Sequence, residues 1–384
     1  MERILARITG EKPGPTLVFF AGLHGNEPAG VTALQEVSDR LSAREDSFHG
    51  NFIALAGNLN ALEKNIRYHE EDLNRIWHHE RLEQLLSTGA VSSKEELELL
   101  ELLREIHLIF ENCNPPFYFF DLHTTSGPTE PFVIMNDTLL NRRFTRNYPL
   151  PTILGIEEYL GGALLSYLND KGYVSIGFES GQHEAPEAIE NARHFIWFTL
   201  AITGFLKLDA AIQRSLRNDI WNQGKARKTF YEIYFQRLLT EGEYFKMQPN
   251  FENFQWIPRG TTFATDSNGL VTTKKARQIF MPLYQKKGHE AYYFIRKIPG
   301  FFLLLSKYLR WSRMDGLLTR LPGIDWADKE RTTLLANTRI ARFMAKSFFH
   351  LLGYRARKQD ADHLLLRSRE RNARTKSYAA APWY

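Results

Sequence analysis

Cysteine is nearly absent from the sequence, since Cys113 is the only one among 384 residues. One cysteine excludes an intrachain disulfide, and this usage is typical of a reducing, intracellular location, so we expect a cytoplasmic protein. Its neighbours Glu111, Asn112 and Asn114 offer no base that would activate a thiol. We therefore expect a structural role for Cys113 rather than a nucleophilic one.

Long apolar runs are also missing. No stretch approaches the length of about 20 residues that a membrane-spanning helix needs, and the first residues, Met1–Leu5, do not resemble a secretory signal. Hydrophobic residues make up 43% of the chain and charged residues 24%, which is ordinary for a protein with a sizeable packed core. The length of 384 residues predicts two or more domains.

Charge is distributed unevenly. From Arg296 onward the chain holds 19 Lys or Arg against 7 Asp or Glu, a net charge of +12, whereas the preceding residues carry a net charge of −7. We expect a solvated helical face here, and the alternative is a contact with an acidic partner or an anionic membrane surface. Because the sequence contains no zinc-finger pattern and no basic-aromatic module, we expect no nucleic-acid partner.

The most informative stretch runs from Gly22 to Gly30. The apolar run Thr16–Phe20 before it predicts a buried strand, and the apolar spacing after Pro28 predicts a helix. His24 thus follows a strand and Glu27 precedes a helix, at the edge of the sheet where α/β proteins bind ligands. Imidazole nitrogen and carboxylate oxygen are both zinc ligands. Taken alone, this pair is more typical of a polar loop.

A second apolar strand, Phe117–His123, also ends in histidine. The two-residue period of a strand points Asp121 and His123 to the same side, where a carboxylate can fix the tautomer of a metal-binding imidazole. A third strand, Tyr173–Glu179, ends in a carboxylate. Two strands that both end in histidine favour a shared metal site over two unrelated capping residues.

Together these residues carry a resemblance to a known family. The pattern of His24, Glu27 and His123 resembles the zinc site of the succinylglutamate desuccinylase/aspartoacylase family, a branch of the zinc carboxypeptidase fold. The similarity covers roughly residues 15–200, with a shorter patch near Tyr292. Its further motifs are Asn58–Ala61, Arg67–Tyr68, Asp72–Arg75 and Gly177–Gly181.

The resemblance implies one Zn²⁺ per chain, held by His24, Glu27 and His123, and two His with one Glu favour zinc over other divalent metals. It implies that Glu179 accepts the proton of the attacking water and that Arg67 stabilises the oxyanion. It assigns substrate binding to three further residues, which are Asn74, Arg75 and Tyr292. One departure stands out, because Asn169 occupies the position of a substrate-binding arginine in aspartoacylases. N-acetylaspartate is therefore disfavoured as substrate.

The expected fold is α/β, with a zinc-carboxypeptidase-like mixed or parallel sheet flanked by helices. We expect a zinc hydrolase catalytic domain at 1–210, a β-rich lid domain at 225–298 and a helical, basic extension at 299–384. Within the extension, helices are predicted near residues 301–313, 327–353 and 360–372, and a loose end is predicted for Ser377–Tyr384.

The predicted function is zinc-dependent hydrolysis of the amide bond of a small N-acyl amino acid or a related acylated amine. A carboxypeptidase-like hydrolase of peptide ends is the second enzymatic hypothesis. The non-enzymatic hypothesis is a binding protein that acts through its basic C-terminal region. A small-molecule substrate is expected in either enzymatic case, and a homo-oligomer is left open.

Overall fold

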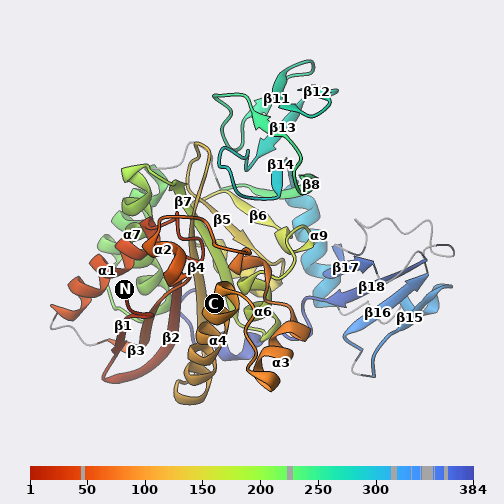
Figure 1. Ribbon diagram of the computed structural model, residues 1–384. Helices are drawn as coiled ribbons and strands as arrows, with labels where there is room; N and C mark the ends of the chain where they lie inside the picture. Colours follow the sequence, from red (N-terminus) through yellow and green to blue (C-terminus); the bar gives the residue numbers. More distant parts are fainter. Residues whose placement is uncertain are drawn as a thin grey trace.

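The computed structural model describes residues 1–44, 48–222, 228–312, 318–329, 331–337, 339, 349, 351–358 and 362–384. Its centre is an 11-stranded mixed sheet in the order β1-β3-β2-β4-β7-β5-β6-β8-β14-β13-β10 (Figure 1). The strands from the first half of the chain are β1 (Ile4–Thr9), β2 (Lys12–Ala21), β3 (His49–Ala56), β4 (Phe117–Thr125), β5 (Phe132–Met135), β6 (Thr152–Leu154) and β7 (Val174–Gln182). Strands β3, β2, β4 and β7 run parallel, and β5 is antiparallel to β7.

Helices cover both faces of this sheet. The helices of residues 1–222 are α1 (Ala29–Ser42), α2 (Leu59–Glu63), α3 (His79–Thr88), α4 (Lys94–Asn112), α5 (Leu139–Thr145), α6 (Leu164–Asp170), α7 (Pro186–Thr203) and α8 (Ala210–Asn222), with 3-10 turns η1 (Leu73–Arg75) and η2 (Ile156–Glu158). On β4, Phe119 packs against Phe110 of α4, whereas Phe120 packs against Phe195 of α7. Successive side chains of a strand point to opposite faces, so α4 and α7 lie on opposite sides of the sheet.

The apolar runs predicted as strands are buried on both faces. Leu17–Ala21 of β2 and Tyr118–Phe120 of β4 are completely inaccessible to solvent. This burial explains why these strands read as continuous apolar runs rather than as alternating patterns. The expected zinc-carboxypeptidase-like α/β sheet is thus confirmed in its mixed, helix-covered form.

Residues 228–298, which we call the lid segment, continue the large sheet and then leave it (Figure 1). Strands β8, β14, β13 and β10 extend the sheet, while β12, β11 and β9 form a separate three-stranded sheet. Their bounds are β8 (Phe230–Leu238), β9 (Phe245–Met247), β10 (Trp256–Ile257), β11 (Thr262–Asp266), β12 (Gly269–Thr272), β13 (Arg277–Phe280) and β14 (Glu290–Lys297). The expectation of a smaller β-rich part is confirmed, while the exact domain boundaries stay predictions.

Residues 299–384, the C-terminal extension, correct the sequence-based prediction. Helix α9 (Gly300–Trp311) forms as predicted, but a four-stranded antiparallel sheet in the order β15-β16-β18-β17 follows it. Its strands are β15 (Ile324–Trp326), β16 (Thr333–Asn337), β17 (Tyr354–Lys358) and β18 (His363–Ser368), before the 3-10 turn η4 (Thr375–Tyr378). The helices predicted near 327–353 and 360–372 are therefore wrong wherever these strands lie, and residues 330, 338, 340–348, 350 and 359–361 are outside the described part.

The reason is pairing. Leucine favours helices intrinsically, but Leu364–Leu366 pair along β16, and Leu334 and Leu366 bury their side chains in the small core of this sheet. The predicted loose end is also corrected. Tyr378 is fully buried, its hydroxyl accepts a hydrogen bond of 2.8 Å from the Val174 amide, and Trp383 Nε1 donates to the Tyr118 hydroxyl at 2.9 Å.

Candidate active site

The candidate site lies at the carboxyl ends of the central parallel strands. His24 follows β2, Glu27 lies two residues before the start of α1, and His123 lies two residues before the end of β4. Gly25 lies between the first two, and a Cβ at this position would meet the Ala61 carbonyl carbon at 2.1 Å. Glycine is therefore required here by the close approach of α2, which holds the turn that presents His24 and Glu27.

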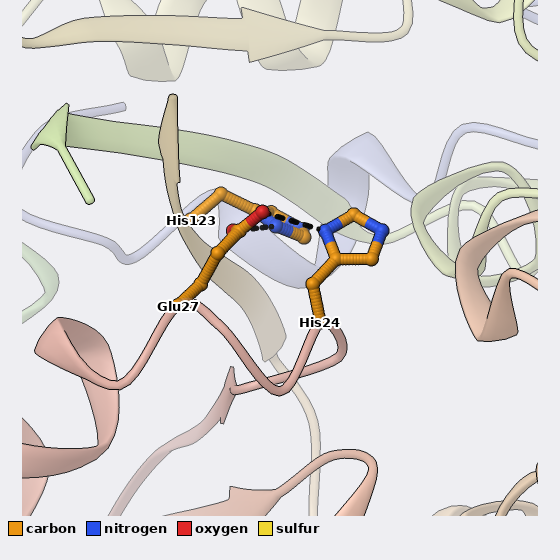
Figure 2. Close-up of side chains that lie close together, drawn as sticks. All are labelled: His24, Glu27 and His123. Carbon is orange, nitrogen blue, oxygen red and sulfur yellow. Dashed lines mark hydrogen bonds and ion pairs between the residues drawn. The ribbon is translucent and has the colours of Figure 1, made fainter. Parts of the chain in front are cut away.

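Figure 2 shows the Glu27 carboxylate between two imidazoles. Nδ1 of His24 lies 2.8 Å from Glu27 Oε1, and Nδ1 of His123 lies 2.9 Å from Glu27 Oε2. The ligand atoms of the three residues all lie within 4.8 Å of one another, and all three side chains are buried. Among the described residues they form a group that is able to hold a metal ion.

The far nitrogens of both imidazoles are held by carboxylates. Nε2 of His24 lies 3.0 Å from Asp72 Oδ1, and Nε2 of His123 lies 2.7 Å from Asp121 Oδ2. A carboxylate on the outer nitrogen orients a histidine and leaves the inner nitrogen free for a metal. Two such histidines with one carboxylate fit the donor set of a catalytic zinc site, which keeps a position open for water or substrate. The residues present therefore fit zinc.

The charges of this cluster stabilise one another. Burial alone raises the pKa of Glu27, but the imidazoles of His24 and His123 hold it well below its usual value. Burial alone lowers the pKa of His123, but Asp121 and Glu27 raise it well above its usual value. Burial raises the pKa of Asp72 too, and His24 and Arg67 outweigh this effect and hold the pKa well below its usual value. The carboxylates thus stay ionised beside the imidazoles.

Glu179 lies on β7 directly beside His123, its partner in the parallel register of β4 and β7. It is buried, and burial raises its pKa to about 8. Its Oε2 atom has no hydrogen-bond partner within the described part of the chain. An unpaired buried carboxylate oxygen is costly, and at functional sites such an atom awaits a ligand.

Arg67 enters the site from the loop between α2 and η1. Its Nη2 donates to Asp72 Oδ2 at 2.9 Å, its Nη1 lies 3.5 Å from Glu27 Oε1, and its buried Nε has no partner among the described residues. Glu95 of α4 holds this loop, since it accepts hydrogen bonds from the Asn58 side chain and from the His69 and Glu70 amides. The Asn58–Ala61 motif therefore positions the loop rather than touching the cleft.

These side chains line one cleft with a cavity volume of about 90 Å³. From the predicted set, it contains His24, Glu27, Arg67, Asn74, Arg75, His123 and Glu179. Asn74 Nδ2 lies 3.4 Å from His123 Nε2, and Arg75 Nε donates to Glu290 Oε1 of the lid segment at 3.0 Å. The structure thus brings seven of the eight predicted residues together.

Tyr292 is the exception. It is buried in the apolar core of the lid segment against Phe263, whereas the next residue, Tyr293, lines the cleft. The register of β14 shifts between Glu290 and Tyr292, and such an irregularity changes which side chains face which side. The choice of Tyr292 is corrected accordingly, since Tyr293 occupies the cleft.

Several residues that line the cleft were not predicted from the sequence. His183 contacts Thr124 Oγ1 through Nδ1 at 2.7 Å and Gln285 Oε1 through Nε2 at 3.3 Å, and burial lowers its pKa. Glu290 and Gln285 reach the cleft from the lid segment. His183 lies only four residues after Glu179, and this short spacing could have indicated that it lies near the site. Nothing local in the sequence marks Gln285, because its place depends on how the lid segment folds over the site.

Comparison with known proteins agrees with this geometry. Residues 13–144 match the family model of the succinylglutamate desuccinylase/aspartoacylase catalytic domain. The resemblance to this family is confirmed. Succinylglutamate desuccinylase from Photorhabdus laumondii is 36% identical over 76 residues, which are 20% of this chain and 23% of the relative. The enzyme of that name from Pseudomonas paraeruginosa is 29% identical over 111 residues, 29% of this chain and 31% of the relative. The matches thus span between about a quarter and a third of these curated relatives.

Solved structures of this family share the fold. Succinylglutamate desuccinylase from Vibrio parahaemolyticus superimposes with a TM-score of 0.55 at 15% identity, over 76% of this chain and 86% of that chain. A succinylglutamate desuccinylase/aspartoacylase from Rhodobacter sphaeroides gives a TM-score of 0.55 at 15% identity, over 76% and 88%. The superpositions show that the chain shares the zinc-carboxypeptidase-like fold of these structures, and at 15% identity they say nothing about its substrate. In the described residues, no helix is long and apolar enough to cross a membrane.

Proposed function

We propose that the protein is a zinc-dependent hydrolase that cleaves the amide bond of a small N-acyl amino acid or a related acylated amine. The observation that carries the proposal is the cleft itself. It places a buried His-Glu-His group beside a carboxylate oxygen of Glu179 and a guanidinium nitrogen of Arg67, both without partners among the described residues.

His24, Glu27 and His123 would hold one Zn²⁺ per chain. When bound, zinc would supply Lewis-acid polarisation of the amide carbonyl and acidify the attacking water. Asp72 and Asp121 keep the two imidazoles oriented, since each contacts an outer nitrogen. These two carboxylates also favour electron-rich imidazoles, which are the better ligands.

Glu179 accepts a proton from the attacking water and later donates it to the leaving nitrogen. Its position beside His123 suits this exchange, because burial raises the pKa of this carboxyl group to about 8, closer to neutral pH than that of an exposed carboxyl. The Arg67 guanidinium donates to the oxygen that becomes negative as the carbonyl turns tetrahedral. Collapse of this species breaks the carbon–nitrogen bond and releases a carboxylate and an amine.

The cleft also limits the substrate. Arg75 is engaged by Glu290 at 3.0 Å and Arg67 by Asp72 at 2.9 Å, so both guanidinium charges of the cleft already face carboxylates. Asn169, at the position of a family arginine, bonds Asn141 and is not part of the cleft lining. Apolar side chains complete the lining, among them Ile134, Ile156 and Leu160. We infer that the preferred acyl group is small and uncharged rather than a dicarboxylate such as succinyl.

Carboxypeptidase-like cleavage of peptide ends remains the second enzymatic hypothesis. The cavity volume of about 90 Å³ and the lid residues in its wall favour a small, enclosed substrate over a peptide chain. A panel of N-acyl amino acids beside a blocked dipeptide separates the two hypotheses. Turnover of N-acetyl amino acids without turnover of the dipeptide supports the proposal, and the reverse result contradicts it.

A further inference from the structure

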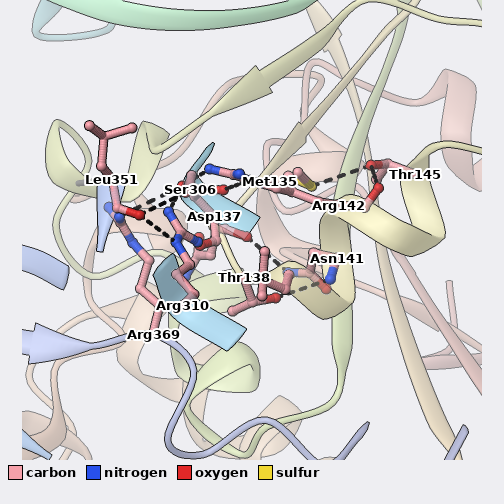
Figure 3. A network of polar contacts seen from close by, with 12 residues as sticks. Met135, Asp137, Thr138, Asn141, Arg142, Thr145, Ser306, Arg310, Leu351 and Arg369 are labelled. Atoms are coloured by element: carbon pink, nitrogen blue, oxygen red, sulfur yellow. Dashed lines mark hydrogen bonds and ion pairs between the residues drawn. The ribbon is translucent and has the colours of Figure 1, made fainter. Parts of the chain in front are cut away.

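Helix α9 turns two of its polar residues, Ser306 and Arg310, inward. Ser306 and Arg310 are buried, and they are the most enclosed side chains of the helix. The Ser306 hydroxyl donates to the Leu351 carbonyl at 2.8 Å, and Arg310 Nη1 donates to the Asp137 carbonyl at 2.8 Å (Figure 3). Arg310 Nη2 also meets Asp137 Oδ2 at 2.7 Å.

The opposite side of α9 is apolar and exposed. Phe301, Leu304, Tyr308 and Trp311, which we call the α9 stripe, are 68%, 50%, 58% and 79% exposed. With 3.6 residues per turn, these four positions fall within an arc of about 80°, on the side opposite Ser306 and Arg310. Leu303 and Leu309 pack inward against the neighbouring cores, so the α9 stripe is a second apolar face that the helix leaves to solvent.

The buried network explains why the helix cannot turn its stripe inward. Asp137 lies between Arg142 and Arg310, and the Arg142 Nη2 atom donates to Asp137 Oδ2 at 2.7 Å. Removing one partner of such a buried group leaves an uncompensated charge, which is strongly destabilising. Rotation of α9 would pull Arg310 out of this network, so the α9 stripe stays exposed to solvent.

Cations border the stripe. Lys307 is exposed and lies three residues after Leu304 and four before Trp311, so it is adjacent to both on the helix surface. Arg296 and Lys297, just before α9, are exposed as well, and Arg296 pairs with Glu232 at 2.7 Å. The chain from Arg296 onward carries a net charge of +12. Two copies meeting through the stripe would bring these cations together, whereas an anionic surface would complement them.

We propose that the α9 stripe docks the protein on an anionic membrane surface. Tryptophan and tyrosine favour the boundary between headgroups and acyl chains, and phenylalanine and leucine enter the apolar side of it. Lysine and arginine near the surface add attraction to anionic lipids, which salt weakens. This inference does not depend on the proposed hydrolase activity, because no residue of the α9 stripe lines the cleft.

The test is co-sedimentation of the full-length protein with vesicles. One set contains phosphatidylcholine with about 30% phosphatidylserine and the other pure phosphatidylcholine. We expect binding to the anionic vesicles that falls in 0.5 M salt, and at least a 10-fold loss of affinity in Phe301→Ser/Trp311→Ser and in Lys307→Glu. Matched controls change exposed residues of the lid segment, Trp256→Ser and Lys246→Glu, and keep wild-type binding.

Far-ultraviolet circular dichroism and the thermal midpoint verify that each variant is folded. The proposal is overturned if the wild type fails to bind anionic vesicles. It is also overturned if the stripe variants bind these vesicles as well as the wild type does. Analytical ultracentrifugation tests the alternative occupant. A concentration-dependent dimer that the stripe variants abolish, without vesicle binding by the wild type, assigns the stripe to a second copy of the chain and equally overturns the proposal.

Discussion

The Nε2 atom of His123 lies 2.7 Å from Oδ2 of Asp121, two residues earlier on the same strand. Both side chains are buried, and the arrangement leaves Nδ1 of His123 facing Glu27. Asp121 thus lies where a carboxylate can orient the imidazole with its Nδ1 atom toward Glu27. The contact follows from the two-residue period of a strand, which is why the sequence could indicate it.

Asp121→Asn should weaken metal binding by 10- to 100-fold, because a neutral amide orients and polarises His123 less well than a carboxylate. Competition with a zinc chelator measures the affinity. Asp39→Asn, an exposed change on α1, is the matched control and should bind like the wild type. Equal zinc affinity in wild type and Asp121→Asn would show that this contact plays no part in metal binding.

Glu179→Gln should keep the metal and lower kcat by about 10³-fold, because the amide cannot accept the proton of the attacking water. Zinc content and steady-state rates on an N-acetyl amino acid are measured together. Glu184→Gln, an exposed change five residues away, should leave both unchanged. A Glu179→Gln enzyme with wild-type turnover would remove this residue from the chemistry.

Glu290→Gln should change the preference for the acyl group. It removes the carboxylate that lies 3.0 Å from Arg75 Nε and leaves a guanidinium in the cleft without its charged partner. The ratio of kcat/KM for an N-succinyl over an N-acetyl amino acid should then rise by about 10-fold or more. An unchanged ratio would mean that Arg75 does not control the charge of the acyl group.

Asp137→Ala should lower the free energy of unfolding by about 3 kcal/mol or more, because it strands the buried Arg142 and Arg310. Burial by itself would raise the pKa of Asp137, but these arginines hold it far below its usual value. Its stabilising effect is therefore complete above the unfolded carboxyl pKa of about 4 and is lost progressively as the pH falls toward the folded value.

Urea unfolding at pH 7, 4 and 3 measures this effect. Wild type should lose more stability on acidification than Asp137→Asn, which no longer carries the titrating group. Asp39→Asn serves again as the exposed control. Parallel losses in wild type and Asp137→Asn would show that this carboxyl group does not account for the acid sensitivity.

The parts of the site that the sequence indicated share one physical origin. His24 follows a buried apolar strand, His123 and Glu179 lie near the ends of two others, and parallel strands bring their carboxyl ends to one edge. The order of strands along the chain therefore predicts that these three side chains lie close together. The contact between His24 and Asp72 is different, because it joins a strand end to a loop 48 residues away and depends on the loop being held by Glu95.

The predictions that the structure corrects also have physical causes. Positions 292 and 293 are both tyrosine, so the sequence does not distinguish them. The register shift on β14 decides which of the two side chains faces the cleft. In the extension, the leucines of β18 have high helix propensity, but pairing with β16 and β17 overrides it. Helix α9 formed where predicted, yet its inward face follows from Asp137 and Glu370, which lie far from it in sequence.

The central claim is that His24, Glu27 and His123 hold a metal that this chain uses for amide hydrolysis. The most direct measurement is elemental analysis of purified wild type and His123→Ala, followed by assay of both on a panel of N-acyl amino acids. The account predicts about one zinc per chain in the wild type, with zinc and activity both lost in His123→Ala. A folded wild type that binds no metal, or a His123→Ala variant that keeps both zinc and activity, would contradict it.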